Sequence, residues 1–200
     1  MRKLIVATTN PHKVEEISAV LGPLGIECVP LPDAGIPEPV EDGATFEANA
    51  RIKARAYAKA LGAMVLADDS GLEVDALGGA PGVHSAYYAG TGANRAERDA
   101  ANNARLLREL EGVPDGQRGA RFVCVLCIAR PDGAIEAEAR GHFEGRIGHA
   151  PRGTNGFGYD PLLVLDDGRT SAELSPAEKN ARSHRGNALR VLVPKLGLAQ

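Results

Sequence analysis

Short apolar runs alternate with longer amphipathic segments along the first half of the chain. Runs over 3–8, 26–31 and 64–71 predict buried strands, because apolar runs of this length bounded by turn residues are typical of strands. A helix is predicted over 11–21, where an Asn precedes the first turn, a Pro opens it, and a Gly-Pro pair follows the last residue. A second, Ala-rich helix is predicted over 45–61, because alanine has the highest helix propensity.

The second half of the chain has the same mixture of helical and strand patterns. The predicted elements are a helix over 94–110, a hairpin of strands over 120–129 and 135–147, a short strand over 162–165, a helix opened by the capping-box pattern Ser175-Pro176-Ala177-Glu178, and an amphipathic helix over 187–196. No internal repeat or interdomain linker is visible. We therefore expect residues 1–200 to form a single domain, or two tightly joined lobes.

The predicted strand over 64–71 ends in two adjacent acids, Asp68 and Asp69. Side chains alternate along a strand, so these carboxylates should point to opposite sides. Acids at a strand end are costly to bury unless they are paired, hydrogen-bonded or bound to a metal. A solvated Asp-Ser-Gly turn is the structural alternative, and alternation alone does not decide which acid faces a site.

A second candidate lies at residues 8–13, between the first strand and the first helix. This turn offers hydroxyls, an amide, free backbone N–H groups and Lys13, and helix N-termini attract anions. It is therefore a plausible phosphate-binding turn, although it lacks the glycines and the Gly-Lys-Ser/Thr ending of a Walker A loop. A well-capped surface helix is the alternative.

Further candidate residues lie around the Ala-rich helix and in a late loop. Glu41 precedes that helix as a cap or a metal ligand, and Lys53 lies on it as a phosphate contact or part of a solvated face. The loop over 152–161 contains an aromatic residue between glycines, Phe157, which suits base stacking. Two anchoring aromatics are the alternative there. The arginines of the helix over 94–110 are interpreted mostly as a solvated face.

Composition narrows the protein class. The chain is 44% hydrophobic and 24% charged, which is typical of a globular protein, and its formal charge of −3 gives no broad basic surface for nucleic acid. No apolar run approaches the roughly 20 residues of a membrane span, and the N-terminus lacks a convincing signal peptide. The cytoplasm is the expected location. Cys124 and Cys127 form a C-x-x-C pair, but within a strand pattern and without a second pair they are interpreted as small core residues.

Taken together, the candidates are acids, lysines, a phosphate-binding turn and an aromatic loop. Carboxylates with several lysines suit a complex of Mg²⁺ with a polyphosphate, since the acids bind a hard cation and the lysines neutralise phosphate oxygens. The sequence contains no cysteine-nucleophile signature, HExxH motif or Ser/His/Asp order. Hydrolysis of a nucleotide by metal-activated water is the hypothesis that follows.

Several motifs occur in an order that resembles a known family. They are Thr8-Thr9-Asn10-x-x-Lys13, Glu41-Asp42-Gly43-x-Thr45-Phe46-x-x-Asn49-Ala50-x-x-Lys53, Ala67-Asp68-Asp69-Ser70-Gly71-Leu72, Gly78-Gly79-Ala80-Pro81-Gly82, Gly156-Phe157-Gly158-Tyr159-Asp160-Pro161 and Lys179-x-x-x-x-His184-Arg185-Gly186. The sequence strongly resembles the XTP/dITP diphosphatases, the inosine triphosphate pyrophosphatase family, essentially from end to end.

The resemblance implies a fold and an activity. The implied fold is an α/β fold with an elongated mixed β-sheet flanked by helices and two lobes around a central cleft. The implied reaction is the Mg²⁺-dependent cleavage of a non-canonical purine nucleoside triphosphate (XTP, ITP or dITP) to its monophosphate and pyrophosphate. A homodimer is also implied. The charge and the lack of a long apolar run indicate that it binds neither nucleic acid nor membrane.

The resemblance also implies roles for individual residues. Asp69 resembles the catalytic proton acceptor and metal-site acid, and Glu41 and Asp68 support the Mg²⁺ site. The implied phosphate contacts are Thr8, Thr9, Asn10, Pro11, His12, Lys13 and Lys53, with Ser70 as a further substrate contact. The implied nucleoside pocket consists of Phe157, Gly158, Tyr159, Asp160, Lys179, His184 and Arg185. Two departures are Phe143, where a Trp is common in relatives, and Asp42, where many carry Thr.

Base preference has a physical basis in this interpretation. Hypoxanthine and xanthine present a 6-oxo acceptor, whereas adenine presents a 6-amino donor. A pocket of donors such as His184, Arg185 and backbone N–H groups would leave mispaired groups buried with adenine, and so reject it. A nucleotide pyrophosphatase with another base preference, such as modified pyrimidines, and a non-catalytic nucleotide-binding protein are the alternatives.

Overall fold

A computed structural model describes residues 2–8 and 10–197. The strands are β1 (Arg2–Val6), β2 (Ile26–Pro30), β3 (Val65–Val74), β4 (Gly119–Ala129), β5 (Ile135–Ile147) and β6 (Leu163–Val164). The α-helices are α1 (Pro11–Leu21), α2 (Phe46–Leu61), α3 (Arg95–Glu109), α4 (Pro176–Arg182) and α5 (His184–Leu192). Short 3-10 helices are η1 (Gly22–Leu24), η2 (Asp75–Leu77), η3 (Gly82–Tyr87), η4 (Asp115–Gln117), η5 (Ser171–Glu173) and η6 (Val193–Leu196). The elements expected from the sequence are thus present, with boundaries shifted by a few residues.

The helix starts follow the capping chemistry of the sequence. The Thr45 hydroxyl accepts a hydrogen bond from the Ala48 N–H at 3.2 Å, and Asn94 caps α3 in the same way through the Glu97 N–H at 3.0 Å. Ser175 forms the predicted capping box at the start of α4. These side chains satisfy N–H groups that the first turn of a helix leaves without partners, which fixes where each helix begins.

The sheet is mixed, as expected. Its strand order is β2-β1-β3-β4-β5-β6. Strand β1 pairs in parallel with β2 and with β3, whereas β5 and β6 are antiparallel. In this register Leu4 lies opposite Cys28, and Ile5 lies opposite both Val29 and Val65. The predicted mixed α/β fold, with helices flanking a β-sheet, is confirmed.

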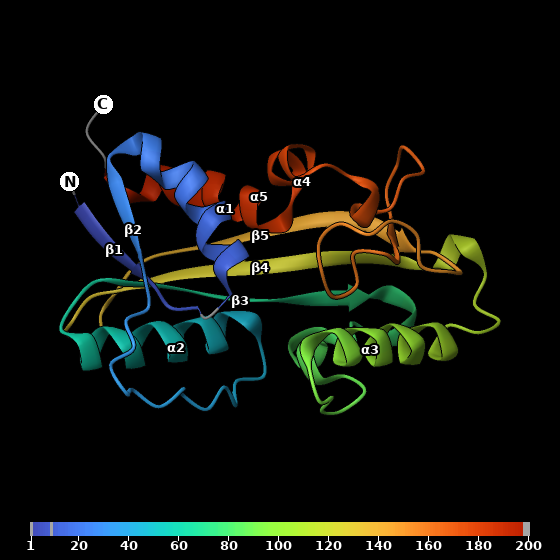
Figure 1. The fold of residues 1–200 in the computed structure, drawn as a ribbon, viewed down its shortest axis with the longest axis horizontal. Coiled ribbons are helices and arrows are strands. Elements are labelled where there is room, and N and C mark those ends of the chain that lie inside the picture. The colour runs from blue at the N-terminus through green and yellow to red at the C-terminus, as the bar shows by residue number, and fades with distance from the viewer. Residues whose placement is uncertain (1, 9, 198–200) are drawn as a thin grey trace. The chain divides into compact units, whose positions relative to one another are not determined.

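The chain divides into two compact units. Unit 1 comprises 1–69, 124–141 and 184–200, and unit 2 comprises 70–123 and 142–183. In unit 1, helices α1 and α5 cover one face of the strands, and helix α2 covers the other (Figure 1). The core on the α1 and α5 side includes Leu4, Leu66, Leu126 and Leu189, all buried.

Unit 2 has its own apolar core. Helix α3 packs on one side of its strands through Leu106, and Leu72, Leu162 and Leu174 are fully buried in the same cluster.

Cys124 and Cys127, which belong to unit 1, are both free and buried, as the sequence predicted. The thiols therefore serve as small core side chains.

Strand β3 is longer than the sequence predicted. It continues beyond Gly71 to Val74, because Leu72 and Val74 keep the alternation going and are both fully buried. The interpretation of Asp68 and Asp69 as a strand end is therefore wrong, since the two acids lie in mid-strand. Regular backbone on both sides of the pair thus fixes the opposite directions of their side chains.

The last helix also differs from the prediction. It begins at His184 rather than 187, and it ends at Leu192, after which Pro194 belongs to the 3-10 helix η6. Proline cannot donate the backbone hydrogen bond that would continue an α-helix, which explains this end. The earlier start places Arg185 in the first turn of α5, where it is buried.

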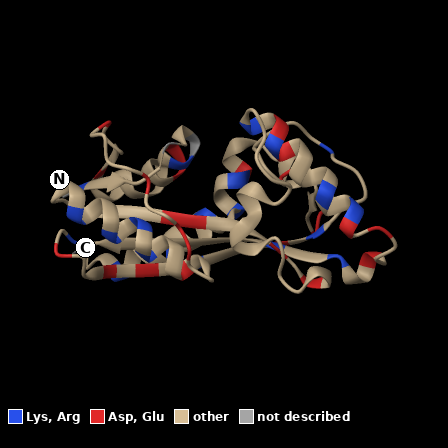
Figure 2. Ribbon diagram, turned by 90° about the horizontal axis from the view of Figure 1, so that it is seen from below, with Lys and Arg blue, Asp and Glu red and all other residues tan. Residues whose placement is uncertain are grey.

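Charges of both signs are interspersed over the helices and loops (Figure 2). This distribution agrees with the formal charge of −3. Among the described residues, no helix has the length and apolar character needed to cross a membrane.

Candidate active site

Asp68 lies at the centre of a buried charge cluster in unit 1. Its side chain is 2% exposed, and its Oδ2 atom accepts hydrogen bonds from Lys13 Nζ at 2.7 Å and from Arg185 Nη2 at 3.1 Å. Burial alone would raise the pKa of Asp68, but the charges of Lys13 and Arg185 outweigh it and hold this pKa well below its usual range. Asp68 is therefore a permanent anion that binds two cations.

Arg185 is bound from two sides. It is 1% exposed, and its guanidinium pairs with Glu16 as well as with Asp68. Burial disfavours the charge of Arg185, but the two carboxylates raise its pKa nonetheless. The guanidinium thus serves the charge cluster, which ties helix α1 and strand β3 to helix α5.

Asp69 has the opposite electrostatic environment. Burial raises its pKa to about 6, and the nearby charges of Glu41 and Asp68 add to this effect. Lys53 and a hydrogen bond with Asn49 act in the other direction without cancelling the rise. A carboxylate with a pKa close to neutrality suits general-base chemistry.

Lys53 connects Glu41, the third predicted acid, to strand β3. Its Nζ atom lies 2.8 Å from Glu41 Oε1 and donates to the Asp68 carbonyl at 3.3 Å. Burial opposes its charge, but Asp68 and Glu41 raise the pKa of Lys53 overall. Lys53 is therefore a fixed cation beside the Asp69 carboxyl, not a member of a solvated face.

The segment that carries Glu41 is held by Asn49 and Gly43. The Asn49 side chain is 3% exposed, and its Oδ1 atom accepts the Gly43 N–H at 2.8 Å. A Cβ atom at Gly43 would lie 2.6 Å from both Asn49 Oδ1 and Ala48 Cβ. Only glycine permits this approach of the loop to helix α2.

The predicted phosphate-binding turn lies at the start of α1. The Thr8 hydroxyl accepts the Asn10 N–H at 3.1 Å, and the Asn10 carbonyl accepts the Lys13 N–H at 3.1 Å. Pro11 is the first residue of the helix, as predicted. Thr9 and the side chain of His12 lie outside the part of the chain that the structure describes.

The aromatic loop belongs to unit 2 and is organised around Asp160. This side chain is 2% exposed, and its carboxylate accepts hydrogen bonds from Lys179 Nζ at 2.5 Å, Ser171 Oγ at 2.7 Å and the Phe157 N–H at 2.8 Å. Gly156 has φ +78°, and a Cβ atom there would collide with the Asp160 carboxylate. Asp160 therefore fixes the backbone on which Phe157 is carried.

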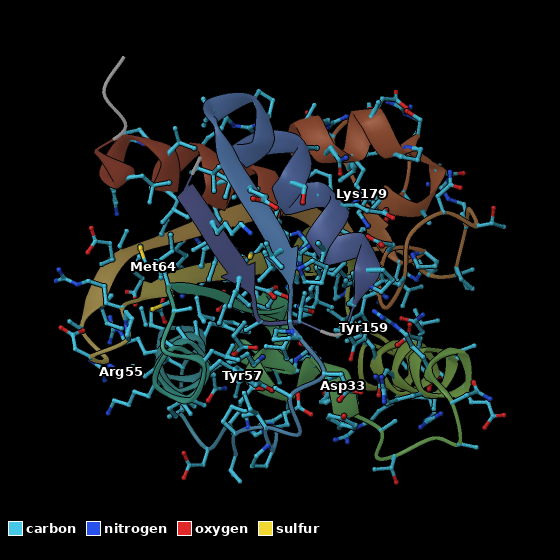
Figure 3. The ribbon with its side chains drawn as sticks, turned by 60° about the vertical axis from the view of Figure 1, so that its left-hand side comes forward. Asp33, Arg55, Tyr57, Met64, Tyr159 and Lys179 are labelled. Carbon is cyan, nitrogen blue, oxygen red and sulfur yellow. The ribbon has the colours of Figure 1, made fainter. Side chains whose placement is uncertain are left out.

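Two further residues of unit 2 contribute to this region, Tyr159 in the loop and Lys179 on helix α4 (Figure 3). Lys179 projects from α4, is 8% exposed and has its Nζ atom 5.0 Å from the centre of the Phe157 ring. The Tyr159 hydroxyl donates to the Ser85 carbonyl at 2.9 Å, and the residue is 4% exposed. Tyr159 thus anchors the loop within unit 2.

The predicted nucleoside residues are divided between the two units. Lys179 and the loop over 157–160 belong to unit 2, together with the partly buried Ser70, whereas His184 and Arg185 belong to unit 1. His184 is 7% exposed. Arg185 pairs with Asp68 and Glu16.

The three predicted metal ligands do not converge in the structure. Within residues 2–8 and 10–197, no three His, Cys, Asp or Glu side chains form a group that could hold a metal ion. Asp68 is engaged by Lys13 and Arg185, and Glu41 by Lys53. Mg²⁺ is usually bound by one or two carboxylates together with substrate phosphates, and Glu41 with Asp69 fits that requirement.

Sequence reasoning missed several residues of these clusters. Glu16 lies 169 positions from its partner Arg185, and no local signal connects them. The arginines of α3 were interpreted mostly as a solvated face, and Arg95 and Arg108 are indeed exposed. Their aromatic contacts were not predicted: the guanidinium carbon atoms of Arg95, Arg98 and Arg105 lie 4.4, 4.8 and 4.0 Å from the centres of aromatic rings. Their spacing along one helix face was the available signal.

Fixed lysines beside carboxylates, a helix-start turn and a carboxyl with a raised pKa are features of proteins that act on phosphate esters. The model of the Ham1 family matches residues 4–195. The chain belongs to the Ham1 family, and the resemblance inferred from the sequence motifs is thereby confirmed.

Named relatives are similar over nearly the whole chain. A dITP/XTP pyrophosphatase of Exiguobacterium sp. is 54% identical over 95% of this chain and 94% of its own. A dITP/XTP pyrophosphatase of Anaeromyxobacter sp. is 50% identical over 94% of this chain and 93% of its own.

Solved structures show the same likeness. A HAM1 protein from Coxiella burnetii has a TM-score of 0.89 at 42% identity, with each chain covered completely. A nucleoside-triphosphatase, also described as a dITP/XTP pyrophosphatase, from Mycobacterium abscessus has a TM-score of 0.76 at 46% identity, over 96% of this chain and 99% of its own.

Proposed function

We propose that this protein hydrolyses XTP, ITP and dITP to the nucleoside monophosphate and pyrophosphate, with Mg²⁺ as its metal. It is a nucleoside-triphosphate diphosphatase, and its relatives named dITP/XTP pyrophosphatases support this activity. The observation that carries the proposal is the Asp69 carboxyl, whose pKa is raised to about 6 beside the partly buried cation Lys53.

Asp69 acts as the proton acceptor for the attacking water. At neutral pH its carboxylate is ionised, yet its pKa of about 6 makes it a stronger base than an exposed aspartate. Lys13, held by Asp68, and Lys53, held by Glu41, neutralise phosphate oxygens. The backbone and hydroxyl groups of residues 8–13 bind phosphate at the start of α1.

Bound Mg²⁺ would supply charge compensation to the phosphate oxygens. Glu41 and Asp69 are the carboxylates suited to hold it, with Asp68 in support through Lys13 and Lys53. Because Asp68 accepts hydrogen bonds from the buried Arg185 and the partly buried Lys13, we assign it the supporting role. The nucleoside is bound by the loop over 157–160 with Lys179 and His184, and Ser70 contacts the substrate.

The proposed preference for a 6-oxo base depends on hydrogen-bond donors in the nucleoside site. Lys179 and His184 offer donor groups, and adenine would leave them mispaired because its 6-amino group is itself a donor. A site that hydrogen-bonds a particular group rejects analogues lacking it far more strongly than an apolar pocket does. We expect turnover of ITP to exceed that of ATP by at least about 100-fold in kcat/KM.

The test is release of pyrophosphate from ITP, XTP, dITP, ATP, GTP and a modified pyrimidine triphosphate with Mg²⁺. Asp69→Asn should lower kcat by about 100-fold or more. Asp33→Asn is the control, because Asp33 is an exposed acid on the loop before α2 (Figure 3). Equal turnover of ATP and ITP would refute the base preference, and an active Asp69→Asn variant would refute the role of Asp69.

Two alternatives have their own outcomes in the same assay. Turnover confined to the pyrimidine nucleotide would indicate another base preference. Binding of ITP without release of pyrophosphate would indicate a nucleotide sensor. Omission of Mg²⁺, with EDTA present, should abolish turnover. Restoration of turnover by added Mg²⁺ would identify the metal requirement.

We further propose that residues 1–200 act as a single pyrophosphatase domain, that the protein is a homodimer, and that it works in the cytoplasm. Three free cysteines support a reducing compartment. The charge of −3 supports a protein that does not bind nucleic acid. Light scattering during size-exclusion chromatography measures the mass directly, and a mass near 20.9 kDa would refute the dimer.

A further inference from the structure

Helix α3 holds both polar groups of one glycine in the aromatic loop. Asp99 Oδ2 accepts the Gly158 N–H at 2.8 Å, and Asn103 Nδ2 donates to the Gly158 carbonyl at 3.0 Å. Asp99 and Asn103 are four residues apart, so they lie on the same face of the helix. Gly158 has φ +63°, a conformation that other residues rarely adopt. Two hydrogen bonds thus maintain this unusual backbone.

Arg95 extends the same row of α3 by one turn. Its guanidinium carbon lies 4.4 Å from the centre of the Phe157 ring, and its Nε atom lies 3.9 Å from Asp99 Oδ2. A guanidinium within about 6 Å of a ring centre is attracted to the ring face. Arg95 therefore restrains the ring, while Asp99 restrains the adjoining backbone.

The backbone of Phe157 is restrained from its other side as well. Its N–H donates to Asp160, whose carboxylate is fixed by Lys179 and Ser171. These contacts all lie within unit 2. The direction of the Phe157 ring is thus determined jointly by the loop and by α3.

The side-chain amide of Asn103 has a hydrogen-bond partner for only one of its two polar atoms. Its Oδ1 atom is buried and has no hydrogen-bond partner among the described residues. A buried polar atom without a partner is destabilising and calls for a reason. The reason is the hydrogen bond from Asn103 Nδ2 to the Gly158 carbonyl. An apolar residue at position 103 would avoid the cost of the unpartnered oxygen but could not donate this hydrogen bond.

We propose that Arg95, Asp99 and Asn103 are positioning residues that preset the Phe157 ring for stacking on a purine base. The three act through Phe157, not on the reacting phosphates. They should therefore affect base binding while leaving proton transfer by Asp69 unchanged. This inference rests on the proposed function, in which the loop over 157–160 binds the nucleoside.

The test compares KM and kcat for ITP in matched variants. Asp99→Ala should raise KM by about 10-fold with kcat changed less than about twofold, since it removes the acceptor of a hydrogen bond. Asp99→Asn should stay close to wild type, because its amide oxygen still accepts. Arg95→Ala should raise KM by about three- to fivefold. Arg108→Ala, an exposed arginine of the same helix, should have no effect.

A double-mutant cycle tests whether the effect passes through Phe157. The product of the KM increases of Asp99→Ala and Phe157→Ala should greatly exceed the KM increase of the double variant. The reason is that residues acting through one ring are coupled. Fully multiplicative effects, or an unchanged KM in Asp99→Ala, would overturn the inference. Loss of stability in Asp99→Ala with wild-type KM would show a structural role instead. If wild-type protein released no pyrophosphate from ITP, the proposed function itself would fail.

Discussion

Asp68 and Asp69 are neighbours on strand β3, yet their pKa shifts have opposite signs. Burial acts to raise both, but Lys13 and Arg185 reverse its effect on Asp68. Asp69 receives less compensation, so its pKa rises to about 6. Alternation of side chains along the strand separates the two environments. One acid is therefore suited to holding cations and the other to exchanging a proton.

Replacement of Asp69 should stabilise the fold at alkaline pH. Its folded-state pKa of about 6 exceeds the ordinary value of 3.8, so the folded protein binds this proton more tightly than the unfolded chain. The resulting stabilisation is complete below pH 3.8 and is lost as pH rises through about 6. We expect Asp69→Asn to be more stable than wild type by about 1–3 kcal/mol at pH 8, with the difference shrinking towards pH 4. Urea unfolding followed by circular dichroism measures this, and an unstable variant at pH 8 would contradict the assignment.

Replacement of Asp68 should have the opposite effect. Its pKa is lowered in the folded protein, so its contribution is present above the ordinary value of 3.8 and is lost as pH falls below it. Asp68→Asn leaves the buried Arg185 and the largely buried Lys13 short of an anion, which costs about 3–5 kcal/mol at pH 7. The same urea experiment should show that the difference in the free energy of unfolding between wild type and Asp68→Asn becomes smaller at acidic pH. A loss below about 1 kcal/mol at pH 7 would mean that the cluster is not a stabilising pair network.

Gly43→Ala should loosen the segment that carries Glu41. The new Cβ would lie 2.6 Å from Ala48 Cβ and Asn49 Oδ1, so the loop must move away from α2. We expect a loss of about 1–3 kcal/mol together with a lower kcat. Gly22→Ala is the matched control, since a Cβ there meets nothing within 4 Å. Equal stability of the two variants would show that the loop tolerates the extra atom.

The buried thiols should be inert in the native protein. Burial raises the pKa of Cys124 and of Cys127 to about 12, which removes the reactive thiolate near neutrality. Cys28 is only partly buried. We expect a thiol reagent at pH 8 to modify Cys28 alone before unfolding and all three cysteines in urea. Mass spectrometry of the labelled peptides gives the sites, and rapid native labelling of Cys124 would contradict the described core.

The sequence predicted the elements well where their signals are local. Thr45, Asn94 and Ser175 cap helices because a side-chain oxygen next to a helix start acts over a few residues. The length of β3 was predicted less well, because Gly71 suggested a turn although Leu72 and Val74 continue the alternating pattern. Tertiary packing decided between the two.

The candidate clusters were predictable only in part. The motifs indicated Lys13, Lys53 and the acids, but no sequence rule pairs Arg185 with Glu16 or Asp99 with Gly158, because these contacts join distant segments. Strand alternation likewise could not separate Asp68 from Asp69, and only the family resemblance gave them different roles. Their different pKa values depend on partners from α1, α2 and α5.

The anchored loop around Phe157 has a thermodynamic consequence. Asp160, Asp99 and Asn103 order its backbone when the chain folds, so the entropy of ordering is lost before any nucleoside arrives. Association with a purine should therefore carry a small ordering penalty, and its rate should be limited by encounter and not by loop rearrangement. Calorimetry on Asp99→Ala should show this as a more unfavourable binding entropy for the nucleoside monophosphate.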